Sequence, residues 1–494
     1  MGNGLFKKHY GRLKFFINGE WIESKSNEFF EDTDPGTGEV IAEVPIATEE
    51  EINMAIEAAF EAFKTWREMP FRDRAKLIHR LRAKFEQYHE ELSRILSQDH
   101  GRAISDSRPT IDRCIENIES AAGAMYSVYK GEHVDQLARG IDCYMIWEPV
   151  GVFLIITPGN IPMHAWSSFV PYALAAGCTV VVSPSWQCPV ASDVLFKVSQ
   201  EVGFPKGVLN LIHIGKKYEL NQQIILNPKV AGLGFIGSSK VGRQLFELCG
   251  KLGKRSSVNG NGKNFIVIAE DADINIAVNS ILRGCFGMSG QRCLGSDNVV
   301  VIGDIYPKLK ENLLNAAKNM KVGYGLNEDT EMGPMTTIEN KEKVERFIEK
   351  GILEGAKLIL DGRGLKVPGY EGGYYLGPTI FENVSIHMQI AKEESFGPIC
   401  NLIRAKSLDE AIEWINYATP YGHSACVVTQ SGKIARRFIR ECEVGNVGVN
   451  VGIPQPYAFF PLGSKKESHF GIIKSRFDSI RLFLDPKTVT LRWE

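Results

Sequence analysis

The chain has 494 residues, of which 44% are hydrophobic and 23% are charged, and its formal net charge is -2. This length predicts two or three domains, and the balanced charge without a long basic run argues against nucleic acid as a partner. No apolar run approaches the roughly 18 residues that span a bilayer, and the first residues lack the apolar core of a signal peptide, so we expect no membrane association.

Ten cysteines are scattered along the chain, and no CxxC pair occurs among them. This distribution lacks the spacing of metal ligands and of a disulfide framework, so it predicts free thiols and no metal site. Free thiols in turn indicate a reducing compartment, and we expect a cytoplasmic protein.

The N-terminal part predicts helices, because apolar residues recur there at intervals of three and four. These helices are expected at residues 49–66, 72–98 and 111–126, the second ending near Gly101. Strands and helices then alternate. Strands are predicted at residues 150–157, 179–182, 208–212 and 230–236, with helices at 165–176, 191–202, 221–226 and 240–249. Such alternation indicates parallel pairing with right-handed crossovers, as in a doubly wound nucleotide-binding domain.

The alternation restarts after residue 264 and indicates a second α/β domain. Its elements are expected at residues 265–268, 274–286, 298–302, 308–320, 341–354 and 357–360. The terminal strand 488–493 is expected to pair with residues 143–147, outside both domains, and such spare strands commonly serve assembly. We therefore expect a homo-oligomer, a dimer or a tetramer.

The six residues GLGFIG at 232–237 formally fit the dinucleotide motif GxGxxG. The match is weak, because the first two glycines fall inside a predicted strand. Gly237 and Ser238 stand between this strand and the next helix, whose free N–H groups suit a pyrophosphate. On this segment alone, an ordinary strand–turn–helix junction is the favoured explanation.

Two other segments contain candidate catalytic residues. Asn160 lies between two prolines in TPGNIP at 157–162, where its amide can point at a developing oxyanion, although a simple turn asparagine is the commoner case. Cys293 follows Arg292 in a run of glycine and small polar residues, and a neighbouring cation favours the reactive thiolate. The residues alone leave Cys293 open between a nucleophile and a structural cysteine.

Taken together, these stretches resemble the aldehyde dehydrogenase superfamily, in order and over nearly the whole chain. The motifs are FINGEW (16–21), TPGNIP (157–162), GFPKGVLN (203–210), FIGS (235–238), GQRC (290–293), EESFGP (393–398) and KTVTLRW (487–493). The resemblance implies an α/β fold. A Rossmann-type NAD(P)-binding domain would comprise residues 1–130 and 149–257, a catalytic domain 258–455, and oligomerisation strands 131–148 and 480–494.

The resemblance also implies a chemistry. Cys293 would attack an aldehyde, and Asn160 with the Cys293 backbone N–H would hold the oxyanion, so that loss of hydride leaves a thioacyl enzyme. Glu394 and Phe396 match residues that hold the nicotinamide ribose of NAD or NADP. Four further residues are expected at the cofactor: Thr157, Pro158, Gly237 and Ser238.

One departure from the family changes the expected product. The family has a glutamate before GGK, whereas this sequence reads SVNGNGKN at 257–264 with Asn259 in that place. An amide cannot accept a proton from water as a carboxylate can, so hydrolysis of the thioester is expected to be slow. Members similar to methylmalonate-semialdehyde dehydrogenases share this asparagine and release the acyl group to coenzyme A.

That subfamily also supplies an expectation for the substrate. Two arginines matching Arg113 and Arg292 bind a substrate carboxylate there, and a guanidinium suits a carboxylate well. Arg113 is equally well explained as a solvated helix residue. Phe459 and Phe460 indicate an apolar wall, which conflicts with a small polar acid.

A second departure concerns the cofactor. The family has KPxE after its second Rossmann strand, and this sequence has SPSW at 183–186. Ser183 and Trp186 thus replace a lysine and a glutamate that contact the adenosine ribose. Loss of the glutamate removes repulsion toward a 2′-phosphate, while Trp186 could stack on adenine or block the pocket.

Three readings follow. The first is an enzyme that oxidises an aldehyde reversibly to an acyl-CoA. The second is a hydrolytic dehydrogenase that produces a free acid. The third is a catalytically impaired relative, which the altered segment 183–186 favours and the retained Cys293, Asn160, Glu394 and Phe396 oppose.

Overall fold

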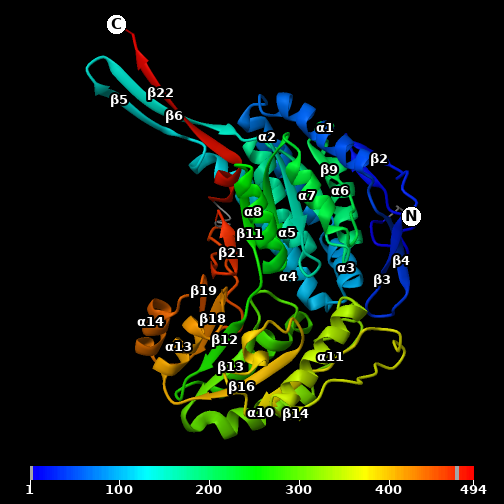
Figure 1. Ribbon diagram of the computed structural model, residues 1–494, viewed down its shortest axis with the longest axis vertical. Helices are drawn as coiled ribbons and strands as arrows, with labels where there is room; N and C mark the ends of the chain where they lie inside the picture. Colours follow the sequence, from blue (N-terminus) through cyan, green and yellow to red (C-terminus); the bar gives the residue numbers. More distant parts are fainter. Residues whose placement is uncertain (1–3, 473–477, 494) are drawn as a thin grey trace.

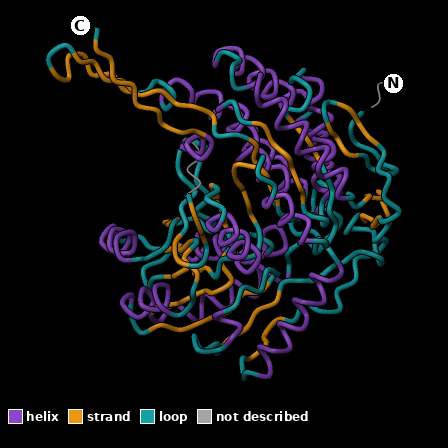
Figure 2. The backbone as a smooth tube through the Cα atoms, turned by 45° about the horizontal axis from the view of Figure 1, so that its top comes forward, coloured by secondary structure: helices purple, strands orange, loops and turns teal. Residues whose placement is uncertain are grey.

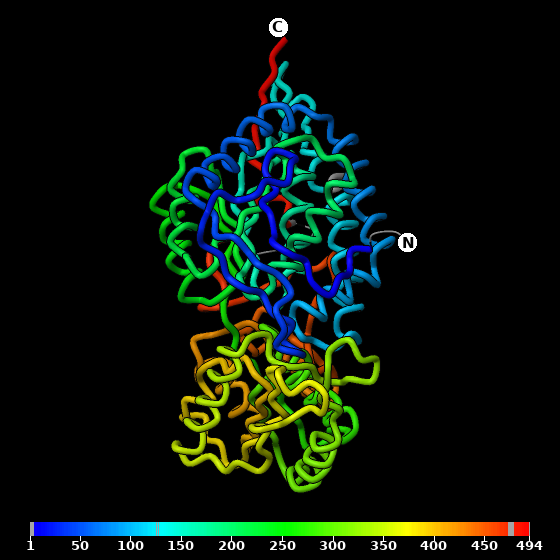
Figure 3. The backbone as a smooth tube through the Cα atoms, turned by 90° about the vertical axis from the view of Figure 1, so that its right-hand side faces the viewer, coloured from blue at the N-terminus to red at the C-terminus, as the bar shows by residue number. Residues whose placement is uncertain are grey.

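Two mixed β-sheets, each covered by helices, organise the computed structural model, and a narrow three-stranded arm projects from one of them (Figure 1). The structure describes residues 4–472 and 478–493, apart from the side chains of Met125, Ser127 and Asp478. In a view turned by a quarter, the two lobes lie one above the other (Figure 3). This arrangement confirms the predicted α/β fold class.

The first sheet has the strand order β2-β1-β9-β8-β7-β10-β11-β21, and its five strands from β9 to β11 are parallel. These are β7 (Val152–Thr157), β8 (Thr179–Pro184), β9 (Leu209–Leu211), β10 (Val230–Ile236) and β11 (Arg255–Asn259). The antiparallel flanks are β1 (Phe15–Ile17), β2 (Glu20–Ile22) and β21 (His469–Gly471). Strand order reverses at β7, which has β8 on one side and β10 on the other, so ligands are expected at the carboxyl ends of these strands.

Helix α1 (Glu49–Trp66) has the predicted bounds, with Thr48 and Glu51 forming a capping box. The prediction of one helix over 72–98 is wrong, because the chain forms α2 (Phe71–Gln87) and α3 (His89–His100). The break falls at Tyr88, where φ is -101° and ψ is 15°, values outside the α region. Helix α3 ends at Gly101 as predicted, with φ at 89°, a conformation that glycine adopts without strain.

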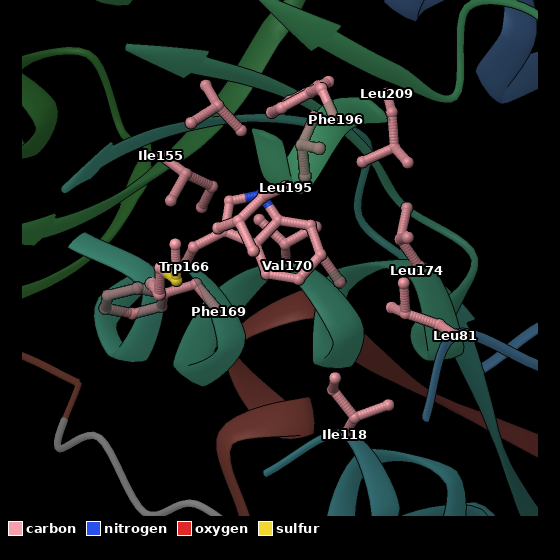
Figure 4. Close-up of a cluster of buried hydrophobic side chains, with 14 of the residues drawn as sticks. Leu81, Ile118, Ile155, Trp166, Phe169, Val170, Leu174, Leu195, Phe196 and Leu209 are labelled. Carbon is pink, nitrogen blue, oxygen red and sulfur yellow. The ribbon is translucent and has the colours of Figure 1, made fainter. Parts of the chain in front are cut away.

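The remaining helices of this lobe lie on the two faces of the sheet. They are α4 (Ile104–Ser127), α5 (Pro162–Ala176), α6 (Pro189–Val202), α7 (Tyr218–Leu226) and α8 (Ser239–Lys251). Figure 4 shows part of the larger core, in which Trp166 and Phe169 of α5 pack between the sheet residue Ile155 and helices on the same face. The opposite face buries alternate strand residues such as Val181 against α1, α7 and α8.

The second sheet has the order β14-β15-β16-β13-β12-β18-β19, and all its strands but β14 run parallel. The strands are β12 (Asn264–Ile268), β13 (Ser296–Ile302), β14 (Lys357–Leu360), β15 (Thr379–Glu382), β16 (Ile399–Ala405), β18 (Ser424–Val428) and β19 (Asn446–Val449). The helices are α9 (Ile274–Ile281), α10 (Tyr306–Lys318), α11 (Ile338–Leu353), α12 (Gln389–Lys392), α13 (Leu408–Tyr417) and α14 (Gly432–Glu441). Two short ladders pair β3 (Phe29–Thr33) with β4 (Val40–Pro45), and β17 (Tyr421–Gly422) with β20 (Lys465–Lys466).

The arm consists of β5 (Glu132–Ala138), β6 (Ile141–Pro149) and β22 (Leu484–Arg492), and Figure 2 shows it extending clear of the body. The predicted pairing of the terminal strand is confirmed, because Thr490 lies opposite Cys143 in an antiparallel register. A 3₁₀ helix (Asp478–Phe483) joins the arm to the body. No helix in the described part of the chain is long and apolar enough to cross a membrane.

Candidate active site

The loop before Cys293 has an unusual backbone. Helix α9 ends at Ile281 and continues as a π-helical turn (Leu282–Phe286) and a 3₁₀ turn (Gly287–Gly290). The predicted element over 274–286 is therefore helical throughout, and its last turn is π-helical. Met288 and Ser289 both adopt left-handed conformations, with φ at 52° and 55°. Such strained residues cluster at functional sites and persist only where their surroundings fix them.

Hydrogen bonds fix this loop against the second lobe. The Ser289 hydroxyl donates to the carbonyls of Gly333 at 2.7 Å and Pro334 at 3.0 Å. Gly290 has φ at 70°, and a Cβ at this position would collide with the Gly397 carbonyl. The loop therefore lies directly against the segment EESFGP. One small cavity is lined both by Gly290, Arg292 and residues 295–297 and by residues 394–397.

Cys293 is half-buried at the end of this loop. Its backbone carbonyl accepts a hydrogen bond from the Asn264 amide at 2.8 Å, and Gly262 lies so close that a Cβ there would be 2.6 Å from the same oxygen. The four residues GNGK at 260–263, which follow β11, therefore lie next to Cys293. We call these residues the GNGK stretch.

Asn160 approaches the cysteine loop from the carboxyl end of β7. It is buried, and its Nδ2 donates to the Gln291 carbonyl at 2.9 Å, two residues before Cys293. The backbone carbonyl of Asn160 accepts a hydrogen bond from the buried guanidinium of Arg102, which also donates to Thr110 at 3.2 Å. Sequence reasoning missed Arg102, since only the fold brings it beneath the TPGNIP turn.

Asn259 is the last residue of β11 and is 2% exposed. Neither its Oδ1 nor its Nδ2 has a hydrogen-bond partner among the described residues. Its backbone carbonyl accepts from the Gly237 N–H at 3.0 Å, which ties the strand end to the start of α8. A buried amide without partners is costly unless something else binds it, and it cannot serve as a carboxylate base.

Glu394 and Phe396 lie on the opposite side of the GNGK stretch. The Glu394 carboxylate accepts hydrogen bonds from the Gly262 N–H at 3.0 Å and from the Asn261 side chain. Burial raises the pKa of Glu394 to about 7, against the lowering effect of these two hydrogen bonds. Phe396 has φ at 52°, so it is a third strained residue in the same neighbourhood, after Met288 and Ser289.

A buried ion pair, not foreseen from the sequence, lies behind these residues. Lys263 is fully buried, and its Nζ is 2.6 Å from Asp297 Oδ2 and 2.6 Å from the Ile390 carbonyl. The Ser395 hydroxyl donates to the same carboxylate at 2.9 Å. The pair thus joins the GNGK stretch, the start of β13 and the EESFGP segment.

The two arginines predicted to bind substrate each have a carboxylate partner from α4. Arg292 Nη2 lies 2.5 Å from Asp106 Oδ1, and Arg113 Nη1 lies 2.7 Å from Glu116 Oε2. The Arg113 guanidinium also stacks on Tyr457, 3.7 Å from the ring centroid. Of the two interpretations of Arg113, the solvated helix residue is the poorer description, because its side chain is only 21% exposed.

The other predicted cofactor residues line the carboxyl edge of the first sheet. Thr157 ends β7 and is buried, and Pro158 follows it half-buried. Gly237 follows β10, and the Ser238 side chain caps α8 by accepting from the Val241 N–H. The first two glycines of GLGFIG lie inside β10, where they leave room for Phe153 and Phe169, so they pack the sheet and do not form a phosphate-binding turn.

This edge fits a dinucleotide. The Ser183 hydroxyl at the end of β8 is 1% exposed and has no hydrogen-bond partner among the described residues, which a bound ribose or phosphate would supply. The capped start of α8 presents N–H groups suited to a pyrophosphate, and Glu394 lies across the cysteine loop. No cluster of three or more metal-ligating side chains occurs in the described part of the chain.

Comparison with known proteins agrees with this geometry. The aldehyde dehydrogenase family model matches residues 21–489. Malonate-semialdehyde dehydrogenase 2 of Geobacillus kaustophilus is 37% identical over 482 residues, 97% of this chain and 99% of that protein. The malonate-semialdehyde dehydrogenase of Pseudomonas aeruginosa is 36% identical over 98% of this chain and 97% of its own length.

Two solved structures extend the similarity. The methylmalonate-semialdehyde dehydrogenase from Oceanimonas doudoroffii has a TM-score of 0.95 at 32% identity, covering 98% of this chain and 99% of that chain. A Sinorhizobium meliloti chain assigned as a methylmalonate-semialdehyde dehydrogenase, solved with NAD, has a TM-score of 0.94 at 31% identity, covering 98% of each chain.

The fold and the site thus define an oxidoreductase that acts on aldehydes with a nicotinamide cofactor. The chain belongs to the aldehyde dehydrogenase family, as the sequence resemblance predicted.

Proposed function

We propose that the protein oxidises a short semialdehyde acid with NAD or NADP and transfers the acyl group from Cys293 to coenzyme A. The names of its relatives support the substrate class. The observation that carries the proposal is the buried amide of Asn259 at the end of β11, where the family has a carboxylate.

In the proposed reaction, the Cys293 thiolate forms a carbon–sulfur bond to the aldehyde carbon. The Asn160 Nδ2 and the Cys293 backbone N–H stabilise the oxyanion, for which Asn160 would exchange its bond to the Gln291 carbonyl. The nicotinamide cofactor supplies a hydride acceptor, and Glu394 and Phe396 orient its ribose. The resulting thioester on Cys293 is cleaved when the thiol sulfur of coenzyme A attacks its carbonyl, and Cys293 leaves as the thiolate.

Asn259 would direct the thioester toward this thiolysis. Water needs a base to become a competent nucleophile, whereas a thiol is far more acidic and supplies its own thiolate. Glu394, with a pKa of about 7, accepts a hydrogen bond from the Gly262 N–H, and Gly262 lies close to the Cys293 carbonyl. Glu394 supports the hydrolytic reaction as a second candidate.

Arg113 and Arg292 are the proposed ligands of the substrate carboxylate. Each would exchange Glu116 or Asp106 for the substrate, and both ion pairs are partly solvent-exposed, which makes such an exchange feasible. Arg292 has the stronger case, because it adjoins Cys293.

The test is NAD(P)H formation on malonate semialdehyde, methylmalonate semialdehyde and uncharged propanal, with and without coenzyme A, with products identified by mass. We expect turnover that depends on coenzyme A, an acyl-CoA product, and a preference for the two acids. Free acid formed equally well without coenzyme A would favour the hydrolytic candidate. Cys293→Ala is the control, and wild-type activity in this variant would refute both enzymatic proposals.

The unpaired strand edges of the arm support the proposal of a homo-oligomer. The free cysteines support the proposal of a cytoplasmic location. Strands β5 and β22 leave their outer edges unpaired among the described residues, and we infer that a second copy of the chain covers them. None of the ten cysteines, which all lie in the described residues, forms a disulfide. This is what a reducing cytoplasm would impose.

A further inference from the structure

A lysine and a tryptophan stack at the carboxyl edge of the first sheet. Trp186 comes shortly after β8 ends at Pro184, and Lys216 follows β9. Strands β8 and β9 are parallel neighbours, so the residues that follow them meet at the same edge. The Lys216 Nζ lies 4.0 Å from the ring centroid of Trp186, whose Nε1 donates to the Tyr218 hydroxyl at 3.3 Å.

The charge of Lys216 is available to a ligand. Its side chain is 58% exposed, and its ion-pair partner is Glu339 of the second lobe, at 3.0 Å and 53% exposed. An ion pair this exposed contributes little stability, so an incoming dianion can replace the carboxylate. The neighbouring Lys217 points elsewhere and pairs with Glu28 at 2.6 Å.

Ser183 provides an independent observation at the same edge. It lies on the same face of β8 as Val181, which packs with Ile224 of α7 and Leu245 of α8. Its buried hydroxyl has no partner among the described residues. A polar group buried in this way is normally satisfied, so a ligand that enters between β8 and these helices is the natural partner.

In Rossmann-type sites an acidic residue near this edge hydrogen-bonds the ribose 2′-hydroxyl of NAD, while a cation accommodates the 2′-phosphate of NADP. Here the acid is replaced by the neutral Trp186, and a lysine lies against it. We propose that Lys216 and Ser183 bind the 2′-phosphate of NADP, with Trp186 packed beside the adenosine, so that the enzyme prefers NADP to NAD.

This inference rests on the proposed nicotinamide-dependent activity, but adenosine fragments test it without any turnover. The first measurement is calorimetric titration of the full chain with 2′,5′-ADP and with ADP, which differ only in the 2′-phosphate. We expect 2′,5′-ADP to bind at least tenfold more tightly, and this preference to shrink as salt is raised. Equal binding of the two, or tighter binding of ADP, would overturn the proposal, whatever the outcome with coenzyme A.

Variants of exposed residues locate the effect. Lys216→Ala should weaken 2′,5′-ADP about tenfold, the size of one charge-assisted contact of about 1.4 kcal/mol, and should leave ADP within about twofold. Glu339→Gln should strengthen 2′,5′-ADP, since it releases Lys216, and Trp186→Glu should reverse the preference. Lys217→Ala is the matched control and should change neither ligand. Equal losses for both ligands in Lys216→Ala, or an effect of Lys217→Ala as large, would contradict the assignment.

Discussion

Asn259 is the residue that we expect to decide between an acyl-CoA product and a free acid. Its amide is buried and has no partner among the described residues. A glutamate, one methylene longer, would place there a carboxylate that can accept a proton from water. We predict that Asn259→Glu creates or raises free-acid formation without coenzyme A, by roughly the 10²–10⁴-fold range of general-base catalysis.

The assay for this prediction is NAD(P)H release with mass identification of the acid. Asn259→Gln keeps an amide of the same length as the glutamate and is the matched control. If Asn259→Glu forms no more acid than this control, then the residue at 259 does not decide the product.

Arg102 is predicted to act through Asn160, as a positioning residue. It donates to the Asn160 carbonyl from a fully buried position, and Thr110 is its other hydrogen-bond partner. Arg102→Ala should lower kcat by up to the roughly 10²–10³-fold cost of losing one oxyanion donor, with a smaller change in KM. Arg102→Lys should recover part of kcat. A rise in KM alone, or no recovery in the lysine variant, would contradict a role in positioning Asn160.

At the scale of single residues, local motifs predict the candidate catalytic residues but not the residues that contact them. Cys293 and Asn160 could be proposed because their motifs are local. Asp106, which pairs with Arg292, could not, because helical spacing gives no sign of a partner in a distant loop. The pair of Arg113 and Glu116 differs, since the two residues are three apart in α4, a spacing that does predict contact. The burial of Lys263 could not be predicted either, because a lysine is rarely buried unless the fold brings a carboxylate next to it, as Asp297 is here.

Among the elements, the start of β13 depends on the pair of Lys263 and Asp297. Loss of one partner leaves a buried charge uncompensated, which costs about 3–5 kcal/mol of the free energy of unfolding. We predict that Asp297→Leu destabilises the protein by this order in urea unfolding. The double variant Lys263→Met with Asp297→Leu removes both charges and should be clearly more stable than the single one. If the double variant is the less stable of the two, the uncompensated charge is not the cause.

His213, two residues after β9, predicts how stability depends on pH. Burial lowers the pKa of His213 to about 3, against about 6.5 in the unfolded chain. Between pH 3 and pH 6.5, His213 is therefore protonated in the unfolded state but neutral in the folded state. The free energy of unfolding consequently falls as the pH drops below about 6.5. Between pH 7 and pH 5 the expected loss from this group is about 2 kcal/mol. His213→Leu should remove that part of the pH dependence in urea unfolding, and an unchanged slope would contradict the assignment.

Element boundaries failed where backbone geometry overrode periodicity. The apolar pattern runs through Tyr88 without interruption, yet the backbone at Tyr88 leaves the α-helical conformation and separates α2 from α3. The π-turn of Leu282–Phe286 likewise continues an apolar helical pattern. No residue type distinguishes a π-helical turn from an α-helical one. The turn is therefore visible only in the structure, where it leads into the loop that contains Cys293.

For the whole molecule, the alternating pattern predicted the parallel core of the first sheet and the strands β12, β13 and β14 of the second, since parallel strands and crossover helices follow from it directly. It did not predict β15, β16, β18 and β19. It could not predict that β21, late in the chain, returns to extend the first sheet beside β11. That return brings residues 467–471 against the GNGK stretch, where the Ser468 hydroxyl donates to the Asn261 carbonyl at 2.6 Å. A strand of three residues has too little pattern to be recognised.

The arm gives the prediction that concerns the molecule as a whole. Strands β5, β6 and β22 bury little within one chain, and β22 presents an edge of unpaired backbone groups. Such an exposed edge is stable in solution when another chain pairs with it or covers it. Truncation before Thr488 should therefore lower the mass measured by light scattering from that of an oligomer to that of a smaller species, while the urea midpoint of the remaining body changes little. Lys487→Ala removes only the exposed ion pair with Glu148 and should keep the full mass. A monomeric wild type, or a truncated chain that retains the oligomer mass, would show that the arm has another purpose.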